Sequence, residues 1–214
     1  MKVASFYKKP IFWLILSPIV LLLIWLFLLP NQSVTSAVDP AAFRNEVVAE
    51  RQKKDEFMRG SAESPIRDKA GFTGLPYFDP DPAFRVVARL DPFSGAQAQK
   101  LVIHLTDGSE EVYDQYGHAS FTLNGQVCRL LVLKHDKELV LLFRDATSGH
   151  ETYGGGRYVD LDPNTVRNNE VVLDFNAAYN PYCAYNPSYA CPLPPPENKL
   201  PVAVRAGERY VAHE

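Results

Sequence analysis

The distribution of hydrophobic positions divides the chain into three stretches. Residues 11–29 are apolar without a single charged side chain, whereas residues 41–58 are rich in Glu, Arg, Lys and Gln and carry few apolar positions. From residue 74 onward, short runs alternate apolar and polar side chains between Gly, Asn and Asp turns. These patterns predict a membrane-spanning helix, a polar helix and a mainly β domain, in that order.

The apolar stretch at residues 11–29 has the length and the flanking charges of a membrane anchor. About 20 mostly apolar residues are needed to cross a hydrocarbon core of about 30 Å. Lys2, Lys8 and Lys9 precede the stretch, and no basic residue follows until Arg44. Because basic residues stay on the cytoplasmic side, we expect a single-pass inner-membrane protein. Its N-terminus is expected in the cytoplasm and the bulk of the chain in the periplasm or outside the cell.

A cleaved signal peptide is the competing interpretation of the same stretch. Thr35-Ser36-Ala37 offers small residues of the kind found at cleavage sites. The apolar region of a signal peptide is normally about 7–15 residues long, and this one is longer. The sequence therefore favours an uncleaved anchor.

Two helix-start signals follow the predicted anchor. Asp39-Pro40 combines an N-cap residue with proline at the first helical position, and predicts a helix over 41–58 that ends at Arg59-Gly60. The sparse apolar positions of this helix indicate that it lies along the domain on a narrow stripe or acts as a stalk. Ser64-Pro65 predicts a second, shorter helix that is closed by Gly71.

The alternating runs predict short consecutive strands. Asn124-Gly125, between two such runs, is the strongest short-range signal for a β-hairpin. Consecutive short strands joined by tight turns are typical of an antiparallel barrel- or sandwich-like domain. The predicted strands are 84–90, 101–105, 111–113, 120–123, 128–133, 138–143, 157–161, 170–175 and 202–205. The predicted divisions of the chain are an anchor (1–30), a polar helical lead-in (31–72) and a β-rich extracytoplasmic domain (73–214).

Charge and cysteine spacing narrow the classes of function. The net charge is −3, and the Lys and Arg residues are scattered among acidic ones, which gives nucleic-acid binding no support. No Cys-x-x-Cys motif and no His pair at ligand spacing is present, so we expect no metal site and no cofactor.

The three cysteines fall into two groups. In an oxidising compartment we expect Cys183 and Cys191 to form a disulfide, which would contribute about 2.5 kcal/mol in the chain-entropy model. Metal binding and a catalytic thiol are the alternatives for this pair. Cys128 alternates within a predicted strand and is expected to be a buried free thiol.

Residues 144–198 hold the candidate binding site, because polar and aromatic residues gather there outside the strand pattern. Three successive glycines at 154–156 permit a sharp turn or a close approach to a ligand. Tyrosines interleaved with asparagines can line a groove for sugars or other polar ligands. The alternatives are a tight turn between two strands and a loop packed on itself. The candidate ligand-binding residues are Glu151, Tyr153, Arg157, Tyr158, Asn176, Asn180, Tyr182, Tyr185 and Asn186.

Three motifs in this region carry a family resemblance. They are residues 143–145 with 151–158, residues 174–176 with 179–187, and residues 191–198. In these motifs the chain resembles the bacterial family catalogued as domain of unknown function 1684, and the resemblance covers roughly residues 43–208. The resemblance implies no activity, since the family has none assigned. It implies an N-terminal membrane or lipid-attachment signal, which many members carry.

Three functions remain open from the sequence. The leading hypothesis is an anchored extracytoplasmic domain that binds a small polar ligand or a cell-envelope glycan. The second is a hydrolase that uses Glu151, Asp145 or Asp174 as general base, so that whether the protein is an enzyme stays open. The third treats residues 144–198 as architecture in a domain that serves a protein partner.

The predicted topology can be tested in intact cells or spheroplasts. We expect added protease to reach the C-terminus, because the lysine flank holds only the N-terminus in the cytoplasm. A C-terminus shielded from protease, together with both Cys183 and Cys191 in the reduced state, would overturn the predicted orientation.

Overall fold

The structure, a computed structural model, describes residues 39–95 and 99–211. These residues belong to one compact unit. The predicted anchor at residues 11–29 lies outside the described residues. No helix within 39–95 or 99–211 is long and apolar enough to cross a membrane.

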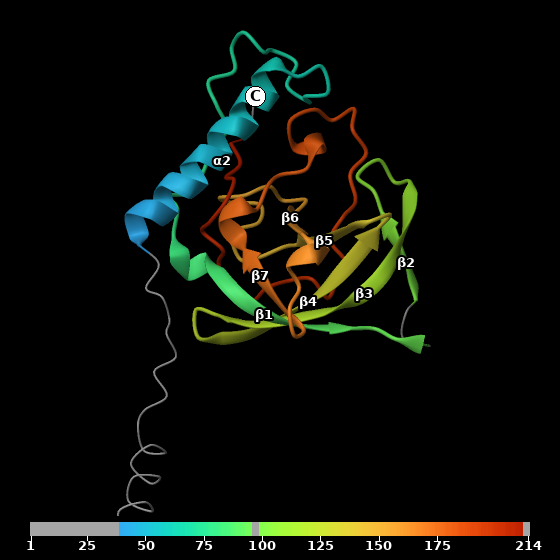
Figure 1. Ribbon diagram of the computed structural model, residues 1–214. Helices are drawn as coiled ribbons and strands as arrows, with labels where there is room; N and C mark the ends of the chain where they lie inside the picture. Colours follow the sequence, from blue (N-terminus) through green and yellow to red (C-terminus); the bar gives the residue numbers. More distant parts are fainter. Residues whose placement is uncertain (1–38, 96–98, 212–214) are drawn as a thin grey trace, which may run out of the picture. The chain divides into compact units, whose positions relative to one another are not determined.

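Helix α2 (Pro40–Gly60) confirms the first predicted helix. The Asp39 carboxylate accepts a hydrogen bond from Ala41 N at 3.0 Å, and proline occupies the first turn. The helix buries a narrow stripe of Phe43, Val47 and Met58 and exposes most of its other side chains. It therefore lies along one side of the domain (Figure 1), which was the first of the two arrangements that the sequence left open.

The second predicted helix, beginning at Ser64-Pro65, is wrong. Residues 61–76 form turns and irregular backbone. The Ser64 hydroxyl donates to Met58 O at 2.6 Å and accepts from Ile66 N at 3.2 Å. The Ser64 side chain thus connects this loop to the end of α2 and bonds to the backbone two residues further on, but no helix follows it.

The core of the domain is one seven-stranded sheet in which every strand pair is antiparallel. The strands run in the order β6-β5-β4-β3-β1-β7, with β2 paired to β3, and the sheet curves into a half-barrel (Figure 1). Their bounds are β1 Arg85–Pro92, β2 Lys100–His104, β3 Glu110–Leu123, β4 Gln126–His135, β5 Glu138–Phe143, β6 Arg157–Leu161 and β7 Glu170–Asp174. Short 3-10 helices are η2 (Pro82–Phe84), η4 (Pro163–Thr165), η5 (Phe175–Ala177) and η6 (Tyr182–Ala184). The mainly β antiparallel fold is confirmed.

The predicted hairpin lies between β3 and β4. Asn124 and Gly125 have φ angles of 50° and 75°, which are the positive values that a tight hairpin turn of the Asn-Gly type requires. The predicted strands 111–113 and 120–123 are parts of a single strand, β3, with a register shift between Gln115 and Gly117. A side chain at Gly117 would collide with the backbone of Asp91, so β1 can approach β3 at this bend only because glycine is there.

The predicted strand at 202–205 is wrong, although the segment is buried in the core. Val204 and Ala206 are fully buried, yet their backbone groups bond to side chains instead of to a strand. Val204 N donates to an Asp145 carboxylate oxygen at 3.1 Å, and the Val204 and Ala206 carbonyls accept from Arg157. The alternation of apolar residues correctly predicted that this segment is buried, but wrongly predicted that its backbone pairs with a neighbouring strand.

Asn198 closes a gap where β4 and β5 separate. The ladder between these strands pairs residues only from Leu133 with Val140 to His135 with Glu138. Beyond it, the fully buried Asn198 amide accepts from Leu131 N at 2.7 Å and donates to the carbonyls of Leu131 and Leu142 at 2.9 and 2.8 Å. The side chain thus replaces the missing strand-to-strand hydrogen bonds.

We expect Asn198→Ala to lower the free energy of unfolding by about 3 kcal/mol, because it leaves buried backbone groups of β4 and β5 without partners. Urea denaturation would measure the loss. The matched control is Asn164→Ala in the exposed 3-10 helix η4, where the side-chain amide donates to Asp162, and we expect a loss below about 1 kcal/mol. Equal losses in the two variants would contradict the role given to Asn198.

Candidate functional site

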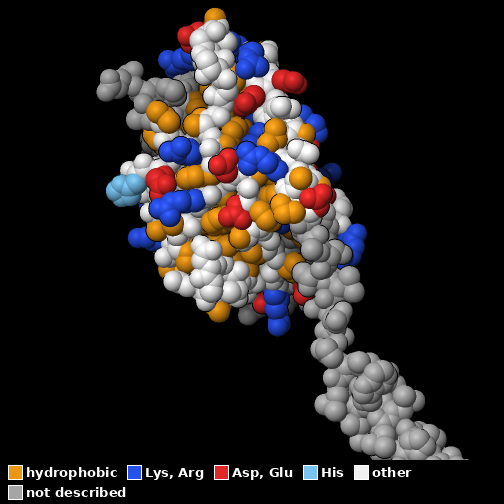
Figure 2. Space-filling model, turned by 90° about the vertical axis from the view of Figure 1, so that its left-hand side faces the viewer, with side chains coloured by type: hydrophobic (Ala, Val, Ile, Leu, Met, Phe, Trp, Pro, Cys, Tyr) orange, Lys and Arg blue, Asp and Glu red, His pale blue; other side chains and the backbone are white. Residues whose placement is uncertain are grey.

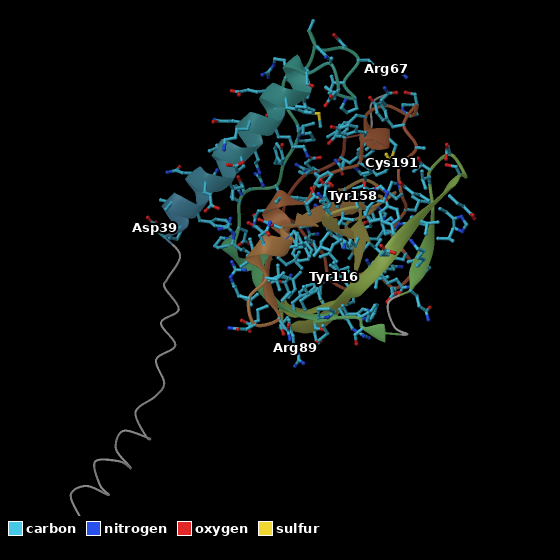
Figure 3. All side chains as sticks on the ribbon, turned by 45° about the vertical axis from the view of Figure 1, so that its right-hand side comes forward. Asp39, Arg67, Arg89, Tyr116, Tyr158 and Cys191 are labelled. Carbon is cyan, nitrogen blue, oxygen red and sulfur yellow. The ribbon has the colours of Figure 1, made fainter. Side chains whose placement is uncertain are left out.

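A groove of about 760 Å³ lies between α2 and residues 177–191. We call it the tyrosine groove, because Tyr158, Tyr179, Tyr182 and Tyr189 line it together with Lys54 of α2. Tyr158 and Cys191, which both line the groove, are labelled in Figure 3. On the face shown in Figure 2, basic and acidic side chains are interspersed among hydrophobic ones.

Backbone pairing fixes one side of the tyrosine groove. Tyr158 of β6 and Tyr179 exchange both backbone hydrogen bonds, at 2.9 and 3.0 Å, and their rings meet edge to face with centroids 5.6 Å apart. The Tyr158 hydroxyl donates to Pro192 O at 2.5 Å. The rings of Tyr182 and Tyr189 also meet edge to face, at 5.4 Å. These contacts hold the aromatic walls in defined positions.

Lys54 supplies positive charge from the helical wall. Its ammonium lies 4.4 Å from the centroid of the Tyr179 ring and 2.6 Å from Glu208 Oε1. Glu208 is 1 % exposed, and its Oε2 accepts from Asn180 N at 2.8 Å and from the Tyr185 hydroxyl at 2.5 Å. A buried carboxylate, held through its Oε2 by two hydrogen bonds, therefore positions the lysine through an ion pair at Oε1.

Asp160, a residue of β6 that is exposed to solvent, supplies a carboxylate to the groove. Desolvation raises its pKa, and a hydrogen bond from the Tyr179 hydroxyl at 2.9 Å partly offsets that rise. Glu50 also lines the groove, but it pairs with Lys53 at 2.6 Å on the exposed face of α2. Asp160 is thus a groove carboxylate that keeps no basic ion-pair partner within 4 Å among the described residues.

The nine residues predicted to bind ligand do not converge on one cavity. Tyr158 and Tyr182 line the tyrosine groove. Asn180 and Tyr185 stand behind it and hold Glu208. Tyr153 packs against Tyr210, away from the groove lining.

The remaining predicted residues make structural contacts. Asn176 bonds in both directions to the backbone of Asp81, at 2.9 and 2.8 Å. The Asn186 carbonyl oxygen accepts from Arg67 at 2.6 Å and from Ser188. The side chains of these two asparagines therefore connect the 175–191 segment to Asp81 and Arg67, which are far away in the sequence.

Arg157 forms a buried ion pair. Its guanidinium lies 2.8 Å from Asp145, both side chains are 1 % exposed, and it also donates to the carbonyls of Val204, Ala206 and Glu208. Desolvation lowers the pKa of Arg157, and the charge of Asp145 works against that effect. No surface of this pair is open to a ligand.

The three carboxylates considered as general bases lie outside the tyrosine groove. Asp145 is buried against Arg157, and Glu151 pairs with Arg205 at 2.9 Å on the surface. Asp174 pairs with Arg85 at 2.6 Å and lines a different cavity of about 320 Å³. Asp160, which lines the groove, is not among the carboxylates predicted from the sequence. Residues two apart in a strand share a face, so its position relative to Tyr158 was a usable signal.

The cysteines are all free thiols in the structure. The predicted disulfide between Cys183 and Cys191 is not formed, but the two residues are in contact, since Cys183 N donates to Cys191 Sγ at 3.1 Å. Cys128 is buried in β4 at 3 % exposure, as predicted. Within residues 39–95 and 99–211, no three His, Cys, Asp or Glu side chains are placed to hold a metal ion.

We expect Arg157→Ala to lower the free energy of unfolding by about 3–5 kcal/mol, because it leaves the Asp145 charge buried without a partner. Arg205→Ala is the matched control: Arg205 pairs with Glu151 while 61 % exposed, and such pairs contribute about 1 kcal/mol or less. Chemical denaturation compares them. A stable Arg157→Ala protein would show that the pair is not a structural support.

Comparisons with known proteins agree with this fold. The family model described as "Protein of unknown function (DUF1684)" matches residues 70–209. A solution structure of an uncharacterised protein from Haloarcula marismortui is 36 % identical to this chain, with a TM-score of 0.62. The match covers 80 % of this chain and 96 % of the archaeal one. The search of curated proteins found no match. The chain therefore belongs to the DUF1684 family.

Proposed function

We propose that this DUF1684 protein binds a small polar ligand of the carbohydrate class in the tyrosine groove. One observation carries the proposal: four tyrosine side chains from β6 and from residues 179–189 line a single cavity together with Lys54 and Asp160. A purely architectural role for residues 144–198 predicts no such gathering of aromatic faces around a cavity.

The chemistry of the groove suits a sugar. Tyrosine rings offer flat apolar faces to the C–H face of a pyranose, while a few fixed polar groups orient its hydroxyls. The volume of about 760 Å³ falls in the range of ligand pockets, about 300–1,000 Å³. A short oligosaccharide is the class of ligand that fits both properties.

The polar groups are held before any ligand arrives. Glu208 holds the Lys54 ammonium, and the Tyr179 hydroxyl holds the Asp160 carboxylate. Because these side chains are already ordered, binding loses less conformational entropy than it would with free side chains. One cation and one carboxylate in the same groove favour a ligand with acceptors as well as donors, such as an N-acetylated envelope glycan.

The groove differs from the region predicted from the sequence. Residues 158–191 lie within the predicted 144–198 region, but the facing wall comes from Lys53, Lys54 and Phe57 of α2. The proposal therefore assigns α2 a part in ligand binding as well as in packing.

A hydrolase remains a second candidate because of Asp160. A carboxyl group whose pKa is raised by desolvation can donate a proton to a leaving group, and Asp160 shows that shift within the groove. Glycoside hydrolysis would require a second carboxylate, for which Glu50 is the candidate. Release of shorter oligosaccharides that is abolished by Asp160→Asn would favour hydrolysis over binding alone.

The anchor and the compartment also belong to this proposal. The apolar stretch at 11–29 and its lysine flank support a single-pass protein whose ligand-binding domain faces the periplasm or the exterior. Envelope glycans are accessible in that compartment.

Binding is tested by titrating the full chain in mild detergent with chitobiose and chitotetraose, followed by calorimetry. We expect Tyr182→Ala and Tyr189→Ala each to weaken binding about tenfold, which corresponds to about 1.4 kcal/mol. Tyr210→Ala is the matched control, since Tyr210 lines a different cavity. Absence of binding by the wild-type protein, or equal effects of all three variants, would count against the proposal.

A further inference from the structure

Two thiols lie against each other behind the Tyr182–Tyr189 wall. Cys183 is in η6 and Cys191 lines the tyrosine groove, and they are 9 % and 6 % exposed. Cys183 N donates to Cys191 Sγ at 3.1 Å, and the Tyr153 hydroxyl lies 3.8 Å from Cys183 Sγ. The contact places both sulfur atoms within reach of a bond after small side-chain rotations.

We propose that Cys183 and Cys191 are a site of reversible thiol oxidation, a dithiol–disulfide pair that fixes the groove wall when oxidised. The pair goes beyond a static disulfide, because both redox states are compatible with the fold. It does not depend on which ligand, if any, the groove binds.

The loop between the cysteines is held without a disulfide. Asn186 N donates to Tyr182 O at 3.0 Å, and Tyr189 N donates to Asn186 O at 3.1 Å. The Asn186 side chain also accepts from Arg67 at 2.6 Å and from Ser188 N at 3.1 Å. Reduction would therefore leave the loop folded, which is the condition for a reversible site.

The backbone of Cys191 is fixed independently. Cys191 N donates to the Thr106 hydroxyl at 3.1 Å, and Thr106 N donates to Cys191 O at 3.0 Å. One sulfur is thus attached to the segment that follows β2 and the other to η6. These hydrogen bonds hold the backbone at Cys191 whether or not the two cysteines are bonded to each other.

The surroundings make Cys183 the nucleophile of the pair. The thiol of Cys191 and the hydroxyl of Tyr153 stabilise a Cys183 thiolate and lower its pKa, against the effect of burial. The pKa of Cys191 is raised by its contact with Cys183 and by burial. A thiolate attacks disulfides and a thiol does not.

The oxidation balances with a low-molecular-weight disulfide as co-reactant. The Cys183 thiolate attacks one sulfur of oxidised glutathione, forms a mixed disulfide and releases one glutathione thiolate. Cys191 then loses its proton and attacks the Cys183 sulfur, which releases the second glutathione. The protein is oxidised by two electrons, and one glutathione disulfide is reduced to two thiols.

Oxidation would change the groove wall through two neighbouring side chains. Tyr182 directly precedes Cys183, and Tyr189 precedes Cys191 by two residues. Their rings already touch edge to face at 5.4 Å. A bond between the cysteines would tie the two ends of this wall together and restrict its motion.

The test equilibrates the folded full chain with mixtures of oxidised and reduced glutathione, then counts thiols and maps the linkage by mass spectrometry. We expect two of three thiols to disappear, with a Cys183–Cys191 link, and to return with dithiothreitol. Cys128 serves as an internal control, since it is buried and burial raises its pKa. Amide exchange over residues 185–189 is expected to slow at least about tenfold on oxidation.

A second measurement separates a reactive pair from two merely adjacent residues. We expect the alkylation of Cys183 by iodoacetamide to reach half its maximal rate below the pH of a free cysteine, whose pKa is about 8.5, and to shift upward in Tyr153→Phe. Glutathione that stays attached to Cys183, thiols that oxidise only after unfolding, or an alkylation midpoint at or above that of free cysteine would each overturn the proposal.

Discussion

The buried ion pair between Arg157 and Asp145 is the interaction on which the rest of the domain depends. Arg157 projects from β6 and binds the carbonyls of Val204, Ala206 and Glu208, so that it holds the C-terminal segment in the core. That segment places the Glu208 carboxylate, which in turn positions Lys54 on α2. One guanidinium therefore connects the sheet to the helical wall of the groove through its hydrogen bond to Glu208 O and the Glu208–Lys54 ion pair. Two charges taken out of water require this degree of satisfaction, because an incompletely paired charge in the interior is strongly destabilising.

The tyrosine groove forms because residues 175–191 pack against the sheet without forming a strand. Short 3-10 turns and Asn-Pro pairs prevent this segment from forming a strand, and its backbone joins β6 only at Tyr158 and Tyr179. Tyr179, Tyr182 and Tyr189 of this segment line one groove with α2, whose lysine and glutamate side chains provide polar contacts. The sequence presented a ligand groove and a packed loop as alternatives, and the structure has both a cavity and a packed loop here. Tyr158 and Tyr182 line the cavity, whereas Asn176 and Asn186 make packing contacts.

Local signals predicted the sheet well and its long-range partners poorly. Strands β5 and β6 have the bounds expected from the sequence, since positive-φ residues at Asp136 and Gly156 limit them. The wrongly predicted strand at 202–205 and the predicted ligand-binding role of Arg157 have one cause. A side chain far away in the sequence satisfies the backbone of the C-terminal segment, and no periodicity reports such a partner. Lys54 was not predicted as a groove residue for the same reason. The sequence of a polar helix does not show which of its lysines forms an ion pair with a buried glutamate.

The topology of β3 and β4 also bears on how the chain reaches this fold. These two strands are joined by the Asn124-Gly125 turn and share the longest ladder of the sheet, from Asp114 with Lys134 to Leu123 with Gln126. Pairing β3 with β4 closes a short loop, which costs little conformational entropy. The pairing of β1 with β7, and the contact of the C-terminal segment with β6, join residues that are far apart in the sequence. We therefore expect the hairpin to form early and the docking of residues 204–208 to come last, so that the groove exists only once the final segment of the chain is in place.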